Sequence, residues 1–372
     1  MTDPVSSGGG RRGRTKRRVL LWAAPLAVAG LLASCAPSPP AEPQLTSAPP
    51  GMAAPVTEPV VVASHLQAPW DVVFYEDTPL VSLRDSGEIV ELNADGDSRV
   101  AGTVDGVQHR GEGGLLGLAV GSDGLLYAYL TTAQDNRIVR YELEGTPGAL
   151  ALGDSEIVID GLPSAGFHNG GRIAFGPDGM LYAGVGDAGN ASAAQDPDLL
   201  NGKILRMTPD GDVPADNPIA DSYVYSLGHR NVQGLGWTSD GRMIAAEFGQ
   251  DTWDELNVIE PGSNYGWPEV EGMGDTDEFV QPVQVWRTDD ASPSGLAIVA
   301  DTIFIAGLRG ERLIAVPADD LGSSVVYFAG RFGRLRTAVG APDGSIWILT
   351  NNTDGRGEPG DDDDRILSVE LG

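Results

Sequence analysis

A hairpin pattern that recurs six times is the feature that most restricts how this chain can fold. Each copy has two stretches of alternating apolar residues separated by a short turn that contains an aspartate, as in RIAFGPDGMLYAGVG. The turn aspartates lie 42 to 62 residues apart and are Asp77, Asp123, Asp178, Asp240, Asp301 and Asp343. A turn-forming pair between two period-two segments indicates a β-hairpin, and repeats of this length are typical of propeller blades.

Further short apolar segments lie between the hairpins, among them EIVELNA, RIVRYEL, KILRMT, ELNVIE and RLIAVPA. Together with the hairpins they predict four antiparallel strands in each repeat. We therefore predict an all-β fold, a six-bladed β-propeller, over residues 60–372. One blade cannot bury both of its faces alone, so we expect the repeats to form a single domain without helices of useful length.

The N-terminal region differs from the rest in composition. Residues 1–34 combine the basic run RRGRTKRR with the uncharged run VLLWAAPLAVAGLLAS, which predicts a signal peptide rather than a membrane span. Cys35, the only cysteine, follows a Leu-Ala-Ser sequence that resembles a bacterial lipobox. We expect Cys35 to be lipidated, and the alternative is a cysteine that follows an ordinary signal. Residues 35–59 are rich in Pro, Ala, Ser and Thr, which predicts an extended tether.

The charge balance excludes one class of partner. The chain has 53 acidic and 24 basic residues, and its formal net charge is −29. A body this acidic is repelled by nucleic acid and by anionic lipid headgroups. We therefore expect no nucleic-acid partner, and we expect export and lipid anchoring at the outer face of the cell membrane. No second cysteine is present to form an intramolecular disulfide.

His168 and Asp187 flank one of the hairpins, in the segment GFHNGGRIAFGPDGMLYAGVGDAG. His168 precedes the first predicted strand and Asp187 follows the second, so antiparallel pairing would bring both side chains to the same end of the blade. A carboxylate on one ring nitrogen fixes the histidine tautomer and leaves the other nitrogen basic. The pair indicates a general base and its orienting partner, and the alternative is a structural histidine that caps a turn.

Three polar residues in a row, His229, Arg230 and Asn231, precede the next predicted inner strand in SLGHRNVQGLGW. Arginine presents a planar fork that suits carboxylates, and asparagine can both donate and accept hydrogen bonds. This combination before a glycine-rich strand indicates a ligand contact, although any one of the three residues could be structural.

Two more segments carry chemically useful side chains. EFGQDTWDELNVIEPGSNYGWPEVEG, residues 247–272, offers acidic groups and glycine-exposed carbonyls that suit a hard cation such as Ca²⁺, but it has no EF-hand spacing and could be a packed loop. RLRT places Arg334 and Arg336 on one face of a strand, which indicates either an anionic ligand or ion pairs with the acidic surface. The aspartate run at 361–364 is typical of an exposed turn rather than of a second cation site.

The ordered set of motifs resembles the soluble quinoprotein sugar dehydrogenases, which use pyrroloquinoline quinone (PQQ). The matching motifs are GEGGLLGLAV, HNGGRIAFGPDG, GDAGN, NGKILRMTPDG, DNP, GHRNVQG, DELN, NYGWP, SPSG and RLRT, and they extend from about Val60 to the C-terminus. The resemblance implies a propeller that binds PQQ over its central channel, with Ca²⁺ touching the quinone. It also implies oxidation of the anomeric C1 hydroxyl of an aldose to the lactone.

The resemblance implies a role for each matching residue. His168 would take the proton from the anomeric hydroxyl as hydride passes to PQQ, with Asp187 as its partner. Arg230 would polarise the quinone oxygen. The other implied cofactor contacts are Glu112, Asn231, Arg309, Arg334 and Arg336. The implied metal ligands are the backbone carbonyls near Gly249 and Gln250.

Three positions depart from the family pattern. Gln250 stands where aldose enzymes usually have a proline after the glycine, and Phe248 stands where a polar residue is common. Glu112 replaces a glutamine of the glucose enzyme. These departures support a second hypothesis, a redox-inactive cell-surface propeller that binds a sugar or a protein. A lactonase-type hydrolase is a third hypothesis, and it would need carboxylate and amide ligands around a channel metal. The particular sugar, the electron acceptor and the oligomeric state are left open.

Overall fold

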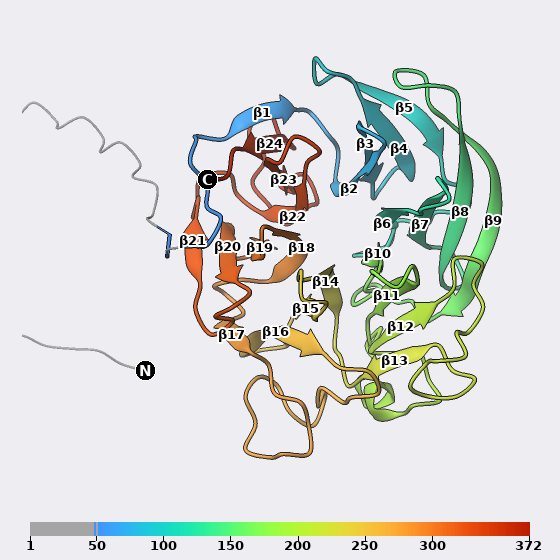
Figure 1. Cartoon of the computed structure of the whole chain (residues 1–372). Coiled ribbons are helices and arrows are strands. Elements are labelled where there is room, and N and C mark those ends of the chain that lie inside the picture. Colours follow the sequence, from blue (N-terminus) through green and yellow to red (C-terminus); the bar gives the residue numbers. More distant parts are fainter. Residues whose placement is uncertain (1–47, 50) are drawn as a thin grey trace, which may run out of the picture. The chain divides into compact units, whose positions relative to one another are not determined.

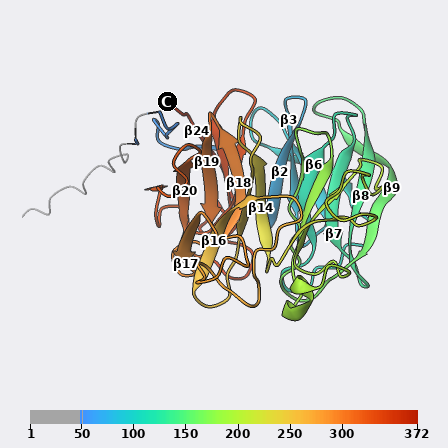
Figure 2. The same cartoon turned by 60° about the horizontal axis from the view of Figure 1, so that its bottom comes forward.

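The computed structural model describes residues 48–49 and 51–372, and within them the regular secondary structure is almost entirely β-strand, joined by turns and loops. Its strands form six four-stranded antiparallel sheets, which stand around a central axis as the blades of a propeller (Figure 1). In the tilted view of Figure 2, the strands run roughly parallel to that axis. The helical element of the described residues is the 3₁₀ helix η1 (Ala191–Gln195). The predicted six-bladed, four-stranded architecture is confirmed.

Five of the six blades are built from consecutive strands, numbered here from I to V. Blade I contains β2 (Pro69–Tyr75), β3 (Thr78–Leu83), β4 (Glu88–Leu92) and β5 (Ser98–Thr103). Blade II contains β6 (Leu115–Val120), β7 (Leu126–Thr131), β8 (Asn136–Glu144) and β9 (Ala151–Leu162). Blade III contains β10 (Ile173–Phe175), β11 (Leu181–Val185), β12 (Lys203–Met207) and β13 (Val224–Leu227). Blade IV contains β14 (Val232–Trp237), β15 (Met243–Glu247), β16 (Trp253–Ile259) and β17 (Gln284–Arg287). Blade V contains β18 (Pro293–Val299), β19 (Thr302–Gly307), β20 (Arg312–Pro317) and β21 (Val325–Tyr327).

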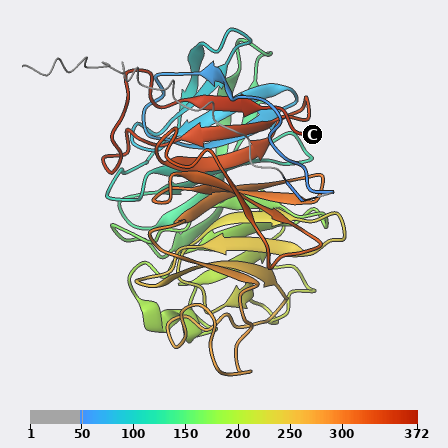
Figure 3. The same cartoon turned by 90° about the vertical axis from the view of Figure 1, so that its left-hand side faces the viewer.

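Blade VI joins the two ends of the described chain. It contains β22 (Leu335–Gly340), β23 (Ile346–Thr350) and β24 (Ile366–Val369), and its outermost strand is β1 (Val60–Ala63). β1 pairs antiparallel with β24, and Figure 3 shows the blue strand lying beside the red ones. Because an N-terminal strand completes the C-terminal sheet, the hydrogen bonds of this sheet close the ring.

The six aspartate turns connect the first and second strands of each blade, as the sequence predicts. Asp178 shows how such a turn is held, because its Oδ1 accepts a hydrogen bond from the Met180 N–H at 3.1 Å and its Oδ2 accepts one from the Tyr182 hydroxyl at 2.9 Å. The loops that precede each first strand and follow each second strand lie at the opposite end of the channel. Both loop types carry the predicted site residues.

The hydrophobic core lies between neighbouring blades rather than within any one of them. Leu80 and Ile89 of blade I pack with Leu126 and Leu130 of blade II, and all four side chains are fully buried. Burying a leucine or isoleucine side chain stabilises a fold by roughly 1.5–3 kcal/mol. Each blade packs one face against the preceding blade and the other face against the following blade. Because these interfaces are tightly packed, the ring holds the loops at the channel end in fixed positions.

The N-terminal segment before β1 differs from the predicted tether. Met52 and Ala54 are buried against blades V and VI, and the Ala53 N–H donates to Thr302 Oγ1 at 2.9 Å. Pro55 forms a β-bridge with Leu371. Contacts with the propeller therefore begin before the predicted boundary at Val60, because the apolar side chains of Met52 and Ala54 are buried against the last strands.

The predicted signal peptide, Cys35 and most of the tether lie outside the described residues. Within residues 48–49 and 51–372, no helix is long and apolar enough to cross a membrane. Lipidation of Cys35 stays a prediction.

Candidate active site

A cavity of about 250 Å³ lies among the loops at the end of the channel opposite the aspartate turns. We call it the loop-end cavity. Six of its lining residues are charged, and they are Glu112, Arg230, Asp254, Arg309, Arg334 and Arg356. The other lining residues are His168, Phe248, Gly249, Gln250, Thr288, Ser292 and Leu308. Arginines outnumber carboxylates on this wall, although the chain as a whole has a net charge of −29.

His168 and Asp187 form the hydrogen-bonded pair that the hairpin pattern predicts. His168 Nδ1 lies 2.7 Å from Asp187 Oδ1, and the histidine side chain is 16% exposed where it faces the cavity. Within the described part of the chain, His168 Nε2 has no hydrogen-bond partner. One ring nitrogen is therefore fixed by a carboxylate, and the other is left for a ligand.

Asp187 is held in its ionised form by donors on both oxygens. Oδ1 also accepts a hydrogen bond from the Gly189 N–H at 2.8 Å, and Oδ2 accepts one from Trp267 Nε1 at 2.9 Å. Burial alone would raise the pKa of Asp187, but the hydrogen bonds from His168, Gly189 and Trp267 keep that pKa below its usual value. An ionised Asp187 favours the tautomer in which His168 Nδ1 carries the proton, so Nε2 is the basic nitrogen.

The backbone of His168 is fixed as firmly as its ring. His168 has a φ of +54°, in the left-handed region that few residues other than glycine adopt. Its N–H donates to Glu112 Oε2 at 2.9 Å, and Glu112 Oε1 lies 2.9 Å from Arg356 Nη2. Burial would raise the pKa of Glu112, but the His168 N–H and Arg356 hold it below its usual value. In this structure Glu112 orients the histidine loop and also lines the cavity.

Arg230 and Asn231 leave donor atoms without partners beside the cavity. Arg230 Nη1 donates to the Phe248 carbonyl at 3.1 Å, and the guanidinium lies over the Trp267 ring at 5.4 Å. Asn231 is fully buried, and its Oδ1 accepts a hydrogen bond from the Gly170 N–H at 3.0 Å. Arg230 Nε and Asn231 Nδ2 are buried and find no partner in the described residues.

The three remaining predicted arginines differ in position. Arg334 lines the cavity, donates to Asp354 Oδ2 at 3.3 Å, and has a buried Nε without a partner in the described residues. Arg309 also lines the cavity, but its side chain is 61% exposed and is paired with Asp289. Arg336 is not among the lining residues. Its guanidinium donates to Asn351 Oδ1 at 2.8 Å and to Gln233 Oε1 at 3.0 Å.

The turn after β15 presents backbone to the cavity. Gly249 and Gln250 line it, and their carbonyl oxygens accept no hydrogen bond from the described residues. A side chain at Gly249 would clash, because its Cβ would overlap the Trp253 carbonyl oxygen. Asp254 accepts hydrogen bonds from the Gly249 N–H at 2.9 Å and from the Ser292 N–H at 2.6 Å. Burial nevertheless raises the pKa of Asp254 to about 6.

Several residues of the site were not predicted from the sequence. Arg356 and Asp254 line the cavity, and Trp267 connects Asp187 to Arg230. Asp254 and Trp267 belong to the motifs DELN and NYGWP, so the motifs flagged their segments but not their functions. Arg356 lies in a loop after β23 that carries no such motif, and only the fold brings it to Glu112.

A second histidine–carboxylate pair lies in the neighbouring blade. His229 Nδ1 lies 3.2 Å from Glu247 Oε1, and His229 Nε2 lies 2.8 Å from Ser226 Oγ. The His229 ring is fully buried and stacks on Tyr265, with 4.7 Å between the ring centroids. Both ring nitrogens are thus occupied, and this histidine of the HRN sequence supports the structure instead of lining the cavity.

The aspartate run at 361–364 is only partly the exposed turn that its composition predicts. Asp361 and Asp362 are exposed, but Asp364 is fully buried and accepts hydrogen bonds from the Thr350 hydroxyl at 3.0 Å and the Thr353 N–H at 3.1 Å. The buried carboxylate therefore joins the loop to blade VI.

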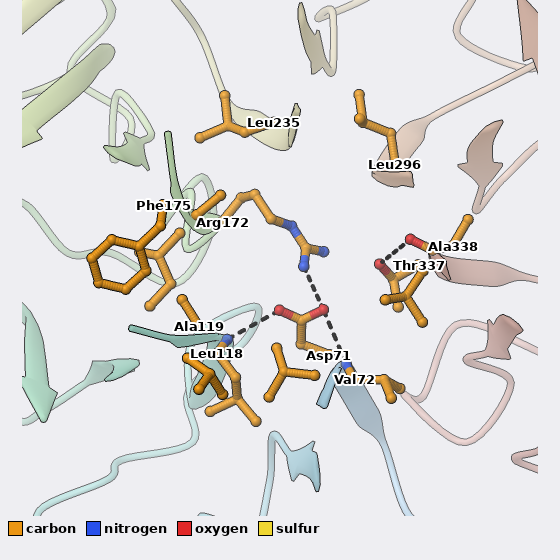
Figure 4. A pocket seen from close by; sticks show the side chains of 15 residues that line it. Asp71, Val72, Leu118, Ala119, Arg172, Phe175, Leu235, Leu296, Thr337 and Ala338 are labelled. Atoms are coloured by element: carbon orange, nitrogen blue, oxygen red, sulfur yellow. Dashed lines mark hydrogen bonds and ion pairs between the residues drawn. The ribbon is translucent and has the colours of Figure 1, made fainter. Parts of the chain in front are cut away.

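A separate pocket of about 300 Å³ occupies the channel between the inner strands (Figure 4). Its lining is mostly aliphatic, and its polar centre is the ion pair between Asp71 and Arg172, with 2.5 Å between Oδ1 and Nη1. Two guanidinium groups lie over the Trp70 ring, that of Arg172 at 4.5 Å and that of Arg336 at 5.6 Å from its centroid. These contacts join blades I, III and VI across the channel below the loop-end cavity, so we assign them a structural role.

The fold and the site together define a class: propellers in which loops at one channel end hold an accessible histidine–aspartate pair and an arginine-rich wall. Residues 66–358 match the family described as Glucose / Sorbosone dehydrogenase. The chain belongs to this family. A solved structure of the PQQ-bound aldose sugar dehydrogenase from Streptomyces coelicolor is 47% identical, with a TM-score of 0.83 over 87% of this chain and 100% of that chain.

Two curated relatives agree with this assignment. The aldose sugar dehydrogenase YliI of Escherichia coli is 30% identical in an alignment 358 residues long, which covers 82% of this chain and 92% of that protein. The quinoprotein glucose dehydrogenase B of Acinetobacter calcoaceticus is 31% identical in an alignment 257 residues long, which covers 58% of this chain and 53% of that protein. The match thus spans nearly all of the first relative and about half the length of the second.

Proposed function

We propose that this protein is a PQQ- and Ca²⁺-dependent aldose dehydrogenase that oxidises the anomeric C1 hydroxyl of a sugar to the lactone. The observation that carries the proposal is the single unpartnered ring nitrogen of His168, which faces a cavity with arginines on its wall. The names of the relatives and the PQQ-bound neighbour support the substrate class and the cofactor.

The residues present fit a polyanionic cofactor such as PQQ, which carries three carboxylates. Four arginines line the cavity, whereas only two of its lining residues, Glu112 and Asp254, carry a carboxylate. Arg230 Nε, Arg334 Nε and Asn231 Nδ2 have no partner in the described residues. A buried donor without a partner costs about 1–3 kcal/mol, so a ligand that accepts from such donors gains that amount. Arg336 would act indirectly, because its donors are already used by Asn351 and Gln233.

The turn at Gly249 and Gln250 fits a hard cation. Calcium prefers oxygen ligands, and the two backbone carbonyls of this turn have no donors in the described residues. Gln250 in place of proline retains the carbonyl group that would bind the ion. Phe248 offers no side-chain ligand, but its carbonyl accepts a hydrogen bond from Arg230 at 3.1 Å and so fixes the guanidinium beside the turn.

The residues of the chain itself would remove the proton from the sugar hydroxyl. His168 Nε2 would accept the proton of the sugar hydroxyl, and Asp187 would stabilise the imidazolium that results. The Glu112 contact to the His168 N–H fixes the backbone and Asp187 fixes the ring, so the base would need no rearrangement before it acts. Arg230 would stabilise negative charge that develops on the acceptor side of the cavity. Bound PQQ would supply the hydride acceptor, and Ca²⁺ beside it would act as a Lewis acid.

We also propose that the protein is exported and held at the outer face of the cell membrane by lipid on Cys35. The basic run, the apolar run and the position of the only cysteine support this proposal. A Cys35→Ser variant should move from the detergent phase to the aqueous phase on Triton X-114 partitioning of whole cells. Equal partitioning of both forms would contradict lipidation.

The test of the dehydrogenase is reconstitution. The propeller from residue 48 onward is titrated with PQQ in CaCl₂, and the absorbance spectrum is recorded before and after a panel of aldoses and a dye acceptor is added. Spectral reduction with dye turnover is expected and would identify the sugar class. Tight PQQ binding without reduction by any aldose would contradict the substrate class. No PQQ binding would overturn the proposal and favour a redox-inactive binding propeller.

A further inference from the structure

One carboxylate oxygen holds the whole turn that follows β15. Glu271 Oε1 accepts hydrogen bonds from four consecutive backbone N–H groups, at 2.7 Å from Gln250, 2.9 Å from Asp251, 3.0 Å from Thr252 and 3.2 Å from Trp253. Burial would raise the pKa of Glu271, but these four N–H groups hold it below its usual value. Successive N–H groups that converge in this way form an anion-binding nest, and here the anion is a side chain of the same protein.

The hydrogen bonds to Glu271 also determine where the carbonyl groups of the turn point. In a trans peptide unit the C=O of one residue points opposite to the N–H of the next. The Gln250 N–H shares a peptide unit with the Gly249 carbonyl, and the Asp251 N–H shares one with the Gln250 carbonyl. By drawing both N–H groups to one side, Glu271 directs both carbonyls to the other side, and Gly249 and Gln250 line the cavity.

The neighbouring peptide units show that the remaining carbonyls of this segment are used elsewhere. The Gly249 N–H donates to Asp254, and the Phe248 carbonyl of that unit accepts from Arg230. The Asp251 carbonyl lies 3.5 Å from Thr288 Oγ1, and the Thr252 carbonyl accepts from the Thr288 N–H at 3.3 Å. Between Phe248 and Thr252, the two carbonyls that accept no hydrogen bond from the described residues are those of Gly249 and Gln250.

We propose that Glu271 is a positioning residue for the cation site: it fixes the turn at residues 249–253 so that two carbonyls point into the loop-end cavity, without itself binding the ion. This inference rests on the proposed function, since it concerns the calcium that the turn would hold. Glu271 is not a lining residue of the cavity, and its Oε1 is already surrounded by four donors. Its role resembles that of outer partners that orient metal ligands elsewhere.

The direct test is calcium affinity measured without PQQ or sugar. Apo-protein is titrated with CaCl₂ by calorimetry for the wild type, Glu271→Ala, Glu271→Gln and the control Glu269→Gln, which alters an exposed carboxylate two residues away. Glu271→Ala should weaken calcium binding about 10–100-fold. Glu271→Gln retains an acceptor oxygen and should recover part of that loss, while Glu269→Gln should match the wild type. Equal affinity of Glu271→Ala and the wild type would overturn the inference.

A second measurement separates this inference from the proposed function. Amide hydrogen exchange of Gln250 to Trp253 in the metal-free protein should be slow in the wild type and in Glu269→Gln, and fast in Glu271→Ala. Fast exchange in the wild type would contradict the positioning role whatever the activity. If exchange behaves as expected but the wild type binds no calcium, the cation assignment fails while the order imposed on the turn stands.

Discussion

Blades III and IV carry the same chemical pair at corresponding positions, and only the pair of blade III faces the loop-end cavity. In each blade a histidine precedes the inner strand and a carboxylate lies at the end of the second strand: His168 with Asp187, and His229 with Glu247. The His168 side chain is 16% exposed, whereas that of His229 is fully buried. Access and an unoccupied second nitrogen distinguish the two.

The surroundings of the two rings explain the difference. The His168 ring contacts the Phe167 ring edge-to-face, with 4.7 Å between the centroids, and its side chain nevertheless stays 16% exposed toward the loop-end cavity. His229 is covered by Tyr265 and bonded to Ser226, and Glu247 also accepts the Arg230 N–H at 3.0 Å. The second pair therefore supports the loop that carries Arg230, while His168 of the first pair faces the loop-end cavity. A histidine–carboxylate contact alone does not identify a catalytic base.

The largest expected effect comes from removing the accessible histidine. His168→Ala should lower turnover by about 10²–10⁴-fold, the usual contribution of a general base. PQQ affinity should change by less than about threefold, since the arginine wall is untouched. Dye-linked turnover and a PQQ titration on the same preparation measure both quantities. Full turnover by His168→Ala would remove the base assignment.

A smaller effect is expected from neutralising its partner. Asp187→Asn should lower turnover by about 10–100-fold, because asparagine no longer stabilises the imidazolium or fixes the Nδ1–H tautomer. The matched change Glu247→Gln in the second pair should leave turnover per folded molecule within about threefold. If both substitutions reduced turnover equally, the distinction between the two pairs would be wrong.

The second pair should affect stability instead. His229→Ala removes a fully buried ring from between Tyr265, Ser226 and Glu247, so we expect a loss of about 2–4 kcal/mol in unfolding free energy. Denaturant titration measures the loss, and His168→Ala is the control, with an expected change of under about 1 kcal/mol at its partly exposed site. The reverse order of stabilities would contradict the assignment.

The smallest expected effect is a pH dependence of stability that comes from Glu255, a carboxylate near Glu247 of the second pair. Burial, followed by the charge of Glu247, raises the pKa of Glu255 from 4.5 to about 8. Between these values the folded protein binds more protons at Glu255 than the unfolded chain does, so this group's contribution to stability falls as the pH rises.

Glu255→Gln removes that titration. The variant should match the wild type near pH 5, where folded Glu255 is protonated, and should melt on the order of 2–4 °C higher near pH 9. Thermal unfolding followed across pH 5–9 for both proteins provides the comparison. Parallel melting curves over the whole range would show that Glu255 does not titrate in this window.

The sequence predicts the strands and blades better than it predicts the side-chain contacts within the site. Alternating apolar residues and turn aspartates define the blades because strand geometry is local, and antiparallel pairing then brings His168 to Asp187. Arg334 and Arg336 could not be distinguished by spacing. The strand register shifts between Leu335 and Thr337, and Arg336 turns to Asn351 and Gln233 while Arg334 reaches the cavity.

Contacts between loops that are distant along the chain could not be predicted from the sequence either. Glu112 lies in the loop between blades I and II and Arg356 in the last loop of blade VI, yet they form an ion pair. Similarly, nothing local marks His229 as buried, because Tyr265, which covers it, comes from a loop 36 positions later. Such contacts depend on how the blades are arranged around the channel, and periodicity gives no information about that.

The most direct test of the account is a single-turnover experiment on two variants of the reconstituted protein. His168→Ala and His229→Ala are each loaded with PQQ and Ca²⁺, mixed with an aldose that reduces the wild-type protein, and followed by absorbance. Reduction should be slowed by about 10²–10⁴-fold in His168→Ala and by less than about threefold in the folded fraction of His229→Ala. Equal rates for His168→Ala and the wild type, or a greater loss in His229→Ala, would contradict the assignment of His168 as the base.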